Sequence, residues 1–454
     1  MKKHSLKIFL VIVIVGLIIA GVLVLKNLNG KDRDFNIILI SIDTLRADHL
    51  GCYHYPRNTS PSVDKFREDG VLFRRCMAQS SSTLTSHASM LTSLIPSHHG
   101  AFFTRGQALP DNIKTMAELL KEKGYRTISF NDGGQIAPKF GLNQGFDKYE
   151  SMSENLKAEH LNFNRVVTKT MTWLDQNPDE KFFLFLHTYE THHPYTPKKR
   201  QLELFESNYN GDLNWQITVE MIERINKGEI KLTDEDKQHI INTYDAEIKS
   251  MDESFGLLID YLKKKKFYDN TLIIFTSDHG EEFGEHGIWA MHSHTLFNDQ
   301  LHVPLLIKLP GSKYSSRKVN HLVMIIDILP TVMDLLGEKM SKDFEGTSLV
   351  PLMKGIPPKK LVFAISQRDM QQTYVSAYWS VMTRKWKLYD AKLYDLLNDP
   401  GELKDIAGCH EDLKTSLQKY ALKYIKRRDK KFSAKKVILD DELRKKLKSL
   451  GYLD

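Results

Sequence analysis

The chain has 454 residues, of which 41% are hydrophobic and 27% are charged, and its formal net charge is +7. This is the composition of an ordinary globular protein that can bury a large core, and its length favours one large domain plus a smaller one. The positive charge is concentrated in patches such as residues 263–266 and 426–436, which suit an anionic membrane surface or an anionic substrate. No nucleic-acid motif accompanies these patches, so no nucleic-acid partner is expected.

The N-terminal region differs from the rest of the chain. Residues 8–25, IFLVIVIVGLIIAGVLVL, form an uncharged apolar run that is long enough to cross a bilayer as a helix. A cleaved signal peptide is the alternative, but no small-x-small cleavage site follows the run. Lys2, Lys3 and Lys7 precede it, which favours a cytoplasmic N-terminus. We therefore expect residues 1–33 to be a cytoplasmic tip and transmembrane anchor of a single-pass protein of the cell membrane, with the main domain extracytoplasmic.

The soluble part begins with an alternation of strands and helices. Residues 35–42, FNIILISI, form a continuous apolar run of the kind expected for a strand that is covered on both faces of a sheet. Further strands are predicted at 125–130, 182–186, 271–276 and 303–308, and helices at 111–123 and 239–265. This order predicts an α/β fold with a mostly parallel or mixed sheet flanked by helices, which binds ligands at the carboxyl ends of its strands.

The pattern loosens after about residue 340. Short strands are predicted at 361–366, 373–383 and 386–394, and a basic helical tail that ends in LKSLGYLD follows them. We therefore divide the soluble part into a larger domain at 34–340 and a smaller antiparallel-sheet subdomain with its tail at 341–454. Cys52, Cys76 and Cys409 have no metal-binding spacing; Cys52 and Cys76 could pair.

Charged and polar side chains stand at the predicted strand ends. Asp43 follows the first buried strand, and Asp278 with His279 follows another in TSDHGEEFGEHG. Such a set favours a divalent cation, because carboxylate oxygens suit Ca²⁺, Mg²⁺ or Mn²⁺ and an imidazole also allows Zn²⁺. Asp43 taken alone would more often cap a turn.

The segment 80–93, SSSTLTSHASMLTS, crowds hydroxyl groups at the start of a predicted helix. A helix that begins near Ser86 would direct unpaired N–H groups and a positive dipole end at an anion close to Thr83, although Ser and Thr also simply cap helices. Histidines gather elsewhere, at His187, His192 and His193 and again at His286, His292 and His294. Of these we select His192 and His292 for anion binding and general acid catalysis.

Six segments in order, IDTLRADHLGCY, TLTSHASMLTSLIPSHHG, HHPY, TSDHGEEFGEHG, VPLLIKLPG and LYDLLNDPGE, resemble the sulfatase-like branch of the alkaline phosphatase superfamily. The resemblance covers about residues 35–454 and implies that superfamily's fold. In sulfatases of this family a Cys or Ser in a C/S-x-P-x-R motif becomes formylglycine, the nucleophile. Here Thr83 matches that residue, Thr85 stands at the Pro, and His87 replaces the Arg.

The substitution at Thr83 changes the expected chemistry. A formylglycine hydrate expels sulfate by re-forming its aldehyde, whereas a threonine ester must be opened by water or an alcohol. Lipoteichoic acid synthases and phosphoethanolamine transferases, which this branch resembles, use a metal-bound Thr in this way. The segment after Tyr125 also lacks the signature that supplies a catalytic Lys in many sulfatases, and Asn131 and Asp132 stand there instead. Asn131 is therefore a candidate substrate-binding residue together with His192 and His292.

The resemblance implies one divalent metal ion, Mn²⁺, Zn²⁺, Ca²⁺ or Mg²⁺, held by Asp43, Thr83, Asp278 and His279. Thr44 in place of a second Asp argues against a plain copy of the sulfatase Ca²⁺ site, and His279, where many sulfatases have Asn, favours Mn²⁺ or Zn²⁺. Thr83 is the expected nucleophile, and His87 is expected to hold the ester's non-bridging oxygens.

We therefore predict a membrane-anchored, metal-dependent hydrolase of phosphate or phosphonate esters, with an anionic substrate such as a lipid head group or a glycan. The alternatives are a sulfatase proper, a phosphoethanolamine- or phosphoglycerol-type transferase, and a non-catalytic membrane-tethered binding protein.

Overall fold

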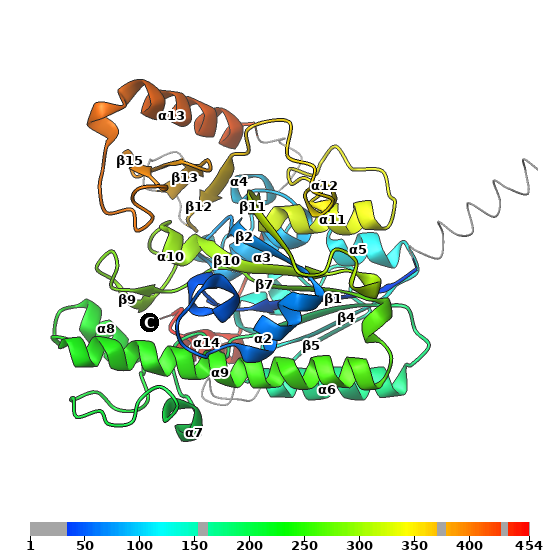
Figure 1. Cartoon of the computed structure of the whole chain (residues 1–454), viewed down its shortest axis with the longest axis horizontal. Helices are drawn as coiled ribbons and strands as arrows, with labels where there is room; N and C mark the ends of the chain where they lie inside the picture. The colour runs from blue at the N-terminus through cyan, green and yellow to red at the C-terminus, as the bar shows by residue number, and fades with distance from the viewer. Residues whose placement is uncertain (1–33, 153–161, 370–377, 428–434, 454) are drawn as a thin grey trace, which may run out of the picture.

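A computed structural model of the chain describes residues 34–152, 162–369, 378–427 and 435–453 (Figure 1). The predicted membrane span at 8–25 lies outside these residues. Within them, no helix is long and apolar enough to cross a membrane. The three cysteines are free, so the pairing of Cys52 with Cys76 that the sequence left open is not formed.

An eight-stranded sheet forms the centre of the molecule, in the order β11-β2-β10-β7-β1-β6-β4-β5. Strand β10 runs antiparallel to both of its neighbours, and the other pairings are parallel. The sheet is therefore mixed, with one reversed strand. Its members are β1 (Asn36–Ile42), β2 (Val71–Met77), β4 (Arg126–Asn131), β5 (Lys148–Ser151), β6 (Phe182–Thr188), β7 (Thr271–Ser277), β10 (His302–Lys308) and β11 (Arg317–Met324).

Helices cover both faces of this sheet, as expected for strands that are apolar throughout. Alternate residues of β1 point to opposite faces, so Ile37 and Leu39 join one core while Ile38 and Ile40 join the other. The first core lies under α3 (Thr83–Thr92), α5 (Met116–Lys121) and α11 (Ile328–Leu335). The second lies under α2 (Pro61–Phe66), α6 (Phe163–Gln176) and α9 (Asp234–Lys264), and Figure 1 shows α6 and α9 along this face.

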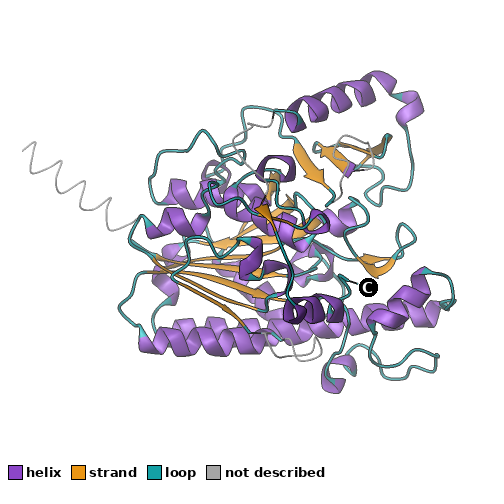
Figure 2. Ribbon diagram, turned by 180° about the vertical axis from the view of Figure 1, so that it is seen from behind, coloured by secondary structure: helices purple, strands orange, loops and turns teal. Residues whose placement is uncertain are grey.

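The C-terminal region forms a second, four-stranded antiparallel sheet in the order β12-β13-β14-β15. Its apolar residues, among them Trp379 and Leu388, belong to the same core as one face of the large sheet. Figure 2 shows this sheet and α13 on the side of the molecule opposite α9. The elements are β12 (Ala364–Gln367), β13 (Trp379–Met382), β14 (Trp386–Tyr389), β15 (Lys392–Asp395), α13 (Glu411–Ile425) and α14 (Asp441–Ser449).

Several predicted elements have different limits. The helix expected near Ser86 begins at Thr83, and the one expected from residue 111 begins at Met116, because Thr115 and Glu118 form a capping box there. The long helix begins at Asp234 rather than His239, behind a capping box at Thr233. The strand predicted at 386–394 is a hairpin of β14 and β15. Part of the strand predicted at 373–383 lies outside the described residues.

Candidate active site and metal centre

The pairing of β1 with β7 brings two carboxylates together. Ile42 and Ser277 are the last residues of their strands and are in register, so Asp43 and Asp278, which directly follow them, lie side by side. On the other side of β1, the backbone N–H of Asp43 donates to the carbonyl of Thr188 at the end of β6 (3.0 Å). Both carboxylates are fully buried. The site therefore lies at the carboxyl ends of parallel strands, where sheets of this type bind ligands.

Thr83 is the first residue of α3 and is also fully buried. The helix has no side-chain cap from Ser82; instead, Gln135 Oε1 accepts a hydrogen bond from the N–H of Leu84 (3.1 Å). The hydroxyl of Ser86 donates to the carbonyl of Asp278 (2.6 Å), which fixes the helix against β7. This places Thr83 Oγ1 3.3 Å from His279 Nε2.

Asp43, Asp278 and His279 form a group whose ligand atoms lie within 4.8 Å of one another. Asp43 Oδ1 and Asp278 Oδ2 are buried and accept no hydrogen bond within the described part of the chain. Burial raises the pKa of both carboxyls well above the ordinary value, and the nearby charge of Glu281 (for Asp43) and of Asp43 (for Asp278) raises it further. Two adjacent buried carboxylates need a positive charge, so these residues fit a divalent cation.

Two further histidines hold this group in place. His187 Nε2 donates to Asp43 Oδ2 (3.2 Å). His87 Nδ1 donates to the carbonyl of Thr83 (2.8 Å), so its Nε2 accepts from the hydroxyl of Ser41 (3.0 Å). Both ring nitrogens of His87 are thus occupied within the protein, and His87 fixes Thr83 instead of offering a free N–H to an ester oxygen as the sequence suggested.

Burial also sets the charge of these two rings. It lowers the pKa of His187 to about 3, and it lowers that of His87 well below the ordinary value, to which the neighbouring His187 adds. Both imidazoles are therefore neutral at pH 7 in this structure.

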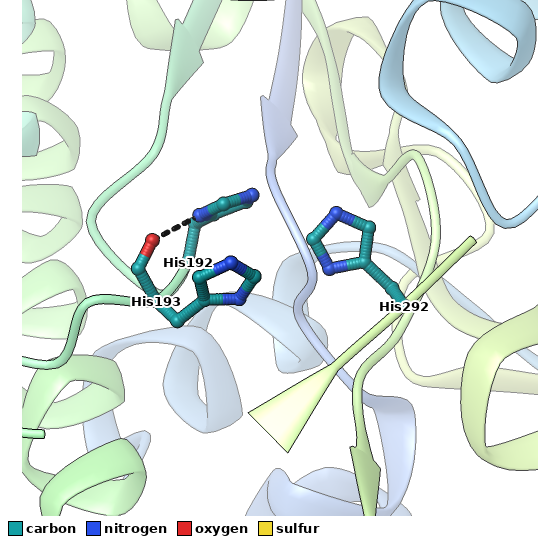
Figure 3. A group of neighbouring side chains, drawn as sticks. All are labelled: His192, His193 and His292. Carbon is teal, nitrogen blue, oxygen red and sulfur yellow. Dashed lines mark hydrogen bonds between the residues drawn. The ribbon is translucent and has the colours of Figure 1, made fainter. Parts of the chain in front are cut away.

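A second group contains His192 and His292, which the sequence analysis selected for one role, together with His193 (Figure 3). The His192 ring lies 4.3 Å from that of His193 and 4.7 Å from that of His292, measured between centroids. Glu281 accepts from His292 Nδ1 (3.0 Å) and from His193 Nδ1 (3.4 Å). Burial, followed by the charge of neighbouring imidazoles, lowers the pKa of His192 and His292 well below the ordinary value. The Glu281 carboxylate therefore fixes the orientation of two of the three rings, those of His193 and His292.

Asn131 is fully buried, and its side-chain amide bonds other residues of the protein. Its Nδ2 donates to Ser129 Oγ (2.9 Å), and its Oδ1 accepts from the N–H of Gly133 (2.9 Å) and the hydroxyl of Ser151 (3.0 Å). The amide thus joins β4 to β5. Its role in substrate binding remains a prediction.

The sequence analysis missed Tyr452. Its hydroxyl lies 2.9 Å from Thr83 Oγ1 and 2.8 Å from His192 Nε2, and its ring lies 5.8 Å from that of Phe103. The sequence offered one signal, Gly451, which marks a helix end just before it. Nothing local showed where the following residues would dock.

The family comparison bears directly on this site. The Sulfatase family matches residues 35–338, which include both side-chain groups, and an N-sulphoglucosamine sulphohydrolase C-terminal family matches 284–428. The chain belongs to the sulfatase family. It is an ester hydrolase of that family, whose members act on sulfuric or phosphoric esters and depend on a metal ion. The predicted family is therefore confirmed, and a non-catalytic binding protein is no longer an alternative.

Individual relatives of this sulfatase-family protein are distant. It is 22% identical to an N-acetylglucosamine-6-O-sulfatase of Bacteroides thetaiotaomicron over 82% of each chain. It is 33% identical to a choline-sulfatase of Rhizobium meliloti, over 39% of this chain and 35% of the other. Among solved structures, a phosphonate monoester hydrolase of Agrobacterium radiobacter has a TM-score of 0.70 at 22% identity, covering 86% of this chain and 95% of its own. That likeness supports the fold.

Proposed function

We propose that this protein is a metal-dependent hydrolase of phosphate or phosphonate esters with Thr83 as its nucleophile. The observation that carries the proposal is the position of Thr83, at the first turn of α3 and 3.3 Å from His279 Nε2. Formylglycine is made from Cys or Ser, and Thr83 is neither. A threonine ester must then be opened by water at its central atom, which suits phosphorus.

Asp43, Asp278 and His279 would hold one divalent cation together with Thr83. When bound, such an ion lowers the pKa of a hydroxyl ligand and polarises the ester. His279 as a ligand favours Mn²⁺ or Zn²⁺ over Ca²⁺. His87 keeps the carbonyl of Thr83 fixed, and the N-terminal end of α3 offers its dipole to the non-bridging oxygens of the ester.

His192 and His292 would supply the proton that the leaving alcohol needs. Their rings lie 4.7 Å apart, and Glu281 fixes the orientation of His292. The hydroxyl of Thr83 would attack the central atom as the bond to the leaving oxygen breaks, which leaves a phospho-threonine. Water would then open that ester and restore Thr83.

The second candidate is a sulfatase, which the family match and the names of the relatives favour. Nitrophenyl phosphate, bis-nitrophenyl phosphate and nitrophenyl sulfate, assayed in parallel on the metal-loaded protein, separate the two functions. We expect one of the phosphate esters to give the highest kcat/KM and a phosphate mass on the Thr83 peptide after rapid quenching. Preference for the sulfate ester, or a sulfate mass on that peptide, would overturn the phosphate proposal.

We also propose that residues 8–25 anchor the protein in the membrane and place the hydrolase outside the cytoplasm. The apolar run and the preceding lysines support this proposal. The substrate would then be an anionic ester such as a lipid head group or a glycan. The full chain should sediment with membranes after an alkaline wash, and a chain that begins at residue 34 should not; recovery of the full chain in the supernatant would contradict the anchor.

A further inference from the structure

A chain of hydrogen bonds joins Thr83 to His192 through the phenol of Tyr452. The oxygens of Thr83 and Tyr452 are 2.9 Å apart, and Tyr452 Oη is 2.8 Å from His192 Nε2. His192 Nδ1 lies within hydrogen-bond distance of the carbonyl of His193. Since a carbonyl oxygen can only accept, Nδ1 carries the hydrogen, and Nε2 of the neutral ring is left as an acceptor.

This assignment fixes the direction of the other two bonds. Tyr452 has one hydroxyl hydrogen and donates it to His192 Nε2, so its oxygen can meet Thr83 only as an acceptor. Thr83 therefore donates to Tyr452, even though His279 Nε2 is within 3.3 Å. If Thr83 donated to His279 instead, two oxygens would face each other at 2.9 Å with no hydrogen between them. Every hydrogen thus points from the nucleophile toward His192.

The position of Tyr452 follows from how α14 ends. The N–H of Tyr452 bonds the carbonyl of Leu447 (2.9 Å), the N–H of Gly451 bonds that of Lys448 (3.0 Å), and Gly451 has φ +77°. This is a Schellman motif, which requires a left-handed residue that glycine adopts without strain. Leu447 and Leu450 are buried, and Asp440 caps the start of the helix through the N–H of Leu443 (2.9 Å). The helix is thus tied at both ends, and its last turn directs Tyr452 into the site.

We infer that Tyr452 is a catalytic residue that relays the proton of the Thr83 hydroxyl to His192. The inference rests on the proposed function, in which Thr83 is the nucleophile, and it adds the route by which that nucleophile loses its proton. The two hydrogen bonds are 2.8–2.9 Å long, and both donate in the direction of His192, which is the geometry that such a proton transfer needs.

The step balances in atoms and charge. As Thr83 Oγ1 forms its bond to the central atom of the ester, its proton passes to Tyr452 Oη and the hydroxyl proton of Tyr452 passes to His192 Nε2. Tyr452 ends as a neutral phenol, and His192 becomes an imidazolium. The imidazolium then gives its proton to the oxygen of the leaving group, whose electron pair comes from the broken ester bond. Neither an oxidant nor a reductant is needed.

The alternative reading is that Tyr452 only covers Thr83 and must move away before substrate binds. A cover would not require the hydroxyl, which contacts the two groups that the reaction uses. The two readings predict opposite effects of Tyr452→Phe, which keeps the ring and removes the hydroxyl. A relay predicts a loss in kcat on the order of 10²-fold with KM nearly unchanged. A cover predicts an unchanged or higher kcat.

The experiment measures kcat and KM of the metal-loaded protein and of five variants with the best of the nitrophenyl esters above. Tyr452→Phe and His192→Ala should each lower kcat, and the double variant should be no slower than the slower single one, because both changes break the same relay. Tyr420→Phe is the matched control, since Tyr420 lies partly exposed on α13. A chain that ends at residue 449 lacks Tyr452, and added phenol should restore part of its kcat.

Each outcome decides between the proposals. The relay would be overturned if the kcat loss of the double variant equalled the product of the two single losses. A Tyr452→Phe protein with full kcat would also overturn it. The metal content of the parent protein and of His192→Ala is a further test. If the parent bound a second equivalent of metal that His192→Ala did not, His192 Nε2 would be a metal ligand, and the relay would be overturned. An active Thr83→Ala protein would overturn the proposed function itself, whereas an inactive one with a fully active Tyr452→Phe protein would overturn the relay alone.

Discussion

Lys387 and Glu402 form a buried ion pair beside the small antiparallel sheet, whereas Asp43 and Asp278 are two buried carboxylates at neighbouring strand ends of the large sheet. The Lys387 Nζ to Glu402 Oε1 distance is 2.6 Å, and Glu402 Oε2 also accepts from the N–H of Asn298 (2.6 Å). Among the described residues, the basic side chains within 4 Å of Asp43 Oδ1 and Asp278 Oδ2 are imidazoles alone, His279 for both (3.9 and 3.4 Å) and His87 for Asp278 (3.5 Å). One pair is balanced within the protein, and the other needs an outside charge.

The difference separates structural from functional buried charge. A balanced pair holds two elements together and becomes costly when one partner is removed. Like charges side by side weaken the fold and persist where a ligand compensates them. The following changes test this distinction, from the largest expected effect to the smallest.

Thr83→Ala should abolish turnover, with a loss in kcat on the order of 10⁴-fold or more, because it removes the proposed nucleophile. The melting temperature should change little. Thr92→Ala is the matched control in the same helix, since the Thr92 hydroxyl bonds only the carbonyl of Ala88 among the described contacts (2.6 Å). Steady-state kinetics with a nitrophenyl ester check the prediction. If Thr83→Ala retained activity, Thr83 would not be the nucleophile, and the functional role of the site at Asp43 and Asp278 would lose its support.

Lys387→Met should lower the free energy of unfolding by about 3–5 kcal/mol, because it leaves Glu402 buried without its counter-charge. Changing Glu402→Gln as well should recover most of that loss, because Gln keeps an acceptor for the N–H of Asn298. Urea denaturation measures both variants, and kcat of the folded fraction should stay unchanged. A single variant as stable as the parent would show that the pair is not structural.

Asp327 is an intermediate case, a buried carboxyl that accepts from the N–H groups of Met324 (2.8 Å) and Thr347 (2.7 Å). Burial raises its pKa to about 7 from 3.8. Between about pH 4 and 7 the folded protein then holds a proton that the unfolded chain releases. Stability should therefore fall as pH rises, by up to about 1.4 kcal/mol per pH unit. Asp327→Asn should flatten that part of the profile, and an unchanged profile would contradict the assignment.

Asp43→Asn should raise the free energy of unfolding of the metal-free protein at pH 7 by about 1–2 kcal/mol, since it removes one of two like charges. The stabilisation that Mn²⁺ gives the parent protein should largely disappear in the variant. Thermal melts with and without the metal measure both effects. A metal-free variant less stable than the parent, or one that Mn²⁺ still stabilises fully, would contradict the proposed role of Asp43.

The sequence was sufficient for the features that depend on local pattern. Apolar runs located β1 and β7, and the alternation of strands and helices implied that Asp43 and Asp278 end up together. Strands β2 and β11 were missed because their patterns are mixed: β2 has two arginines in the middle, and β11 is an edge strand with an exposed polar half. Neither looks like a continuous apolar run.

The contacts across the site were beyond that reasoning. His87 was expected to hold the ester's oxygens, whereas its ring bonds Ser41 on β1, and no spacing rule connects these two residues. Tyr452 follows a basic helix whose docking depends on side chains such as Leu447 and Leu450 meeting a surface formed elsewhere. The local sequence pattern predicts the helix or strand to which a residue belongs. The candidate site depends on contacts between different helices and strands, which that pattern does not show.

The contact between Thr83 and Tyr452 spans 369 positions of the sequence, and the pairing of β1 with β7 also joins distant segments. Contacts of such long range require large loops to close before they contribute, and they slow folding. Secondary structure built from near neighbours can form well before the strand ends and the C-terminal turn meet. During refolding from urea, ester hydrolysis should therefore return after the far-ultraviolet circular dichroism signal.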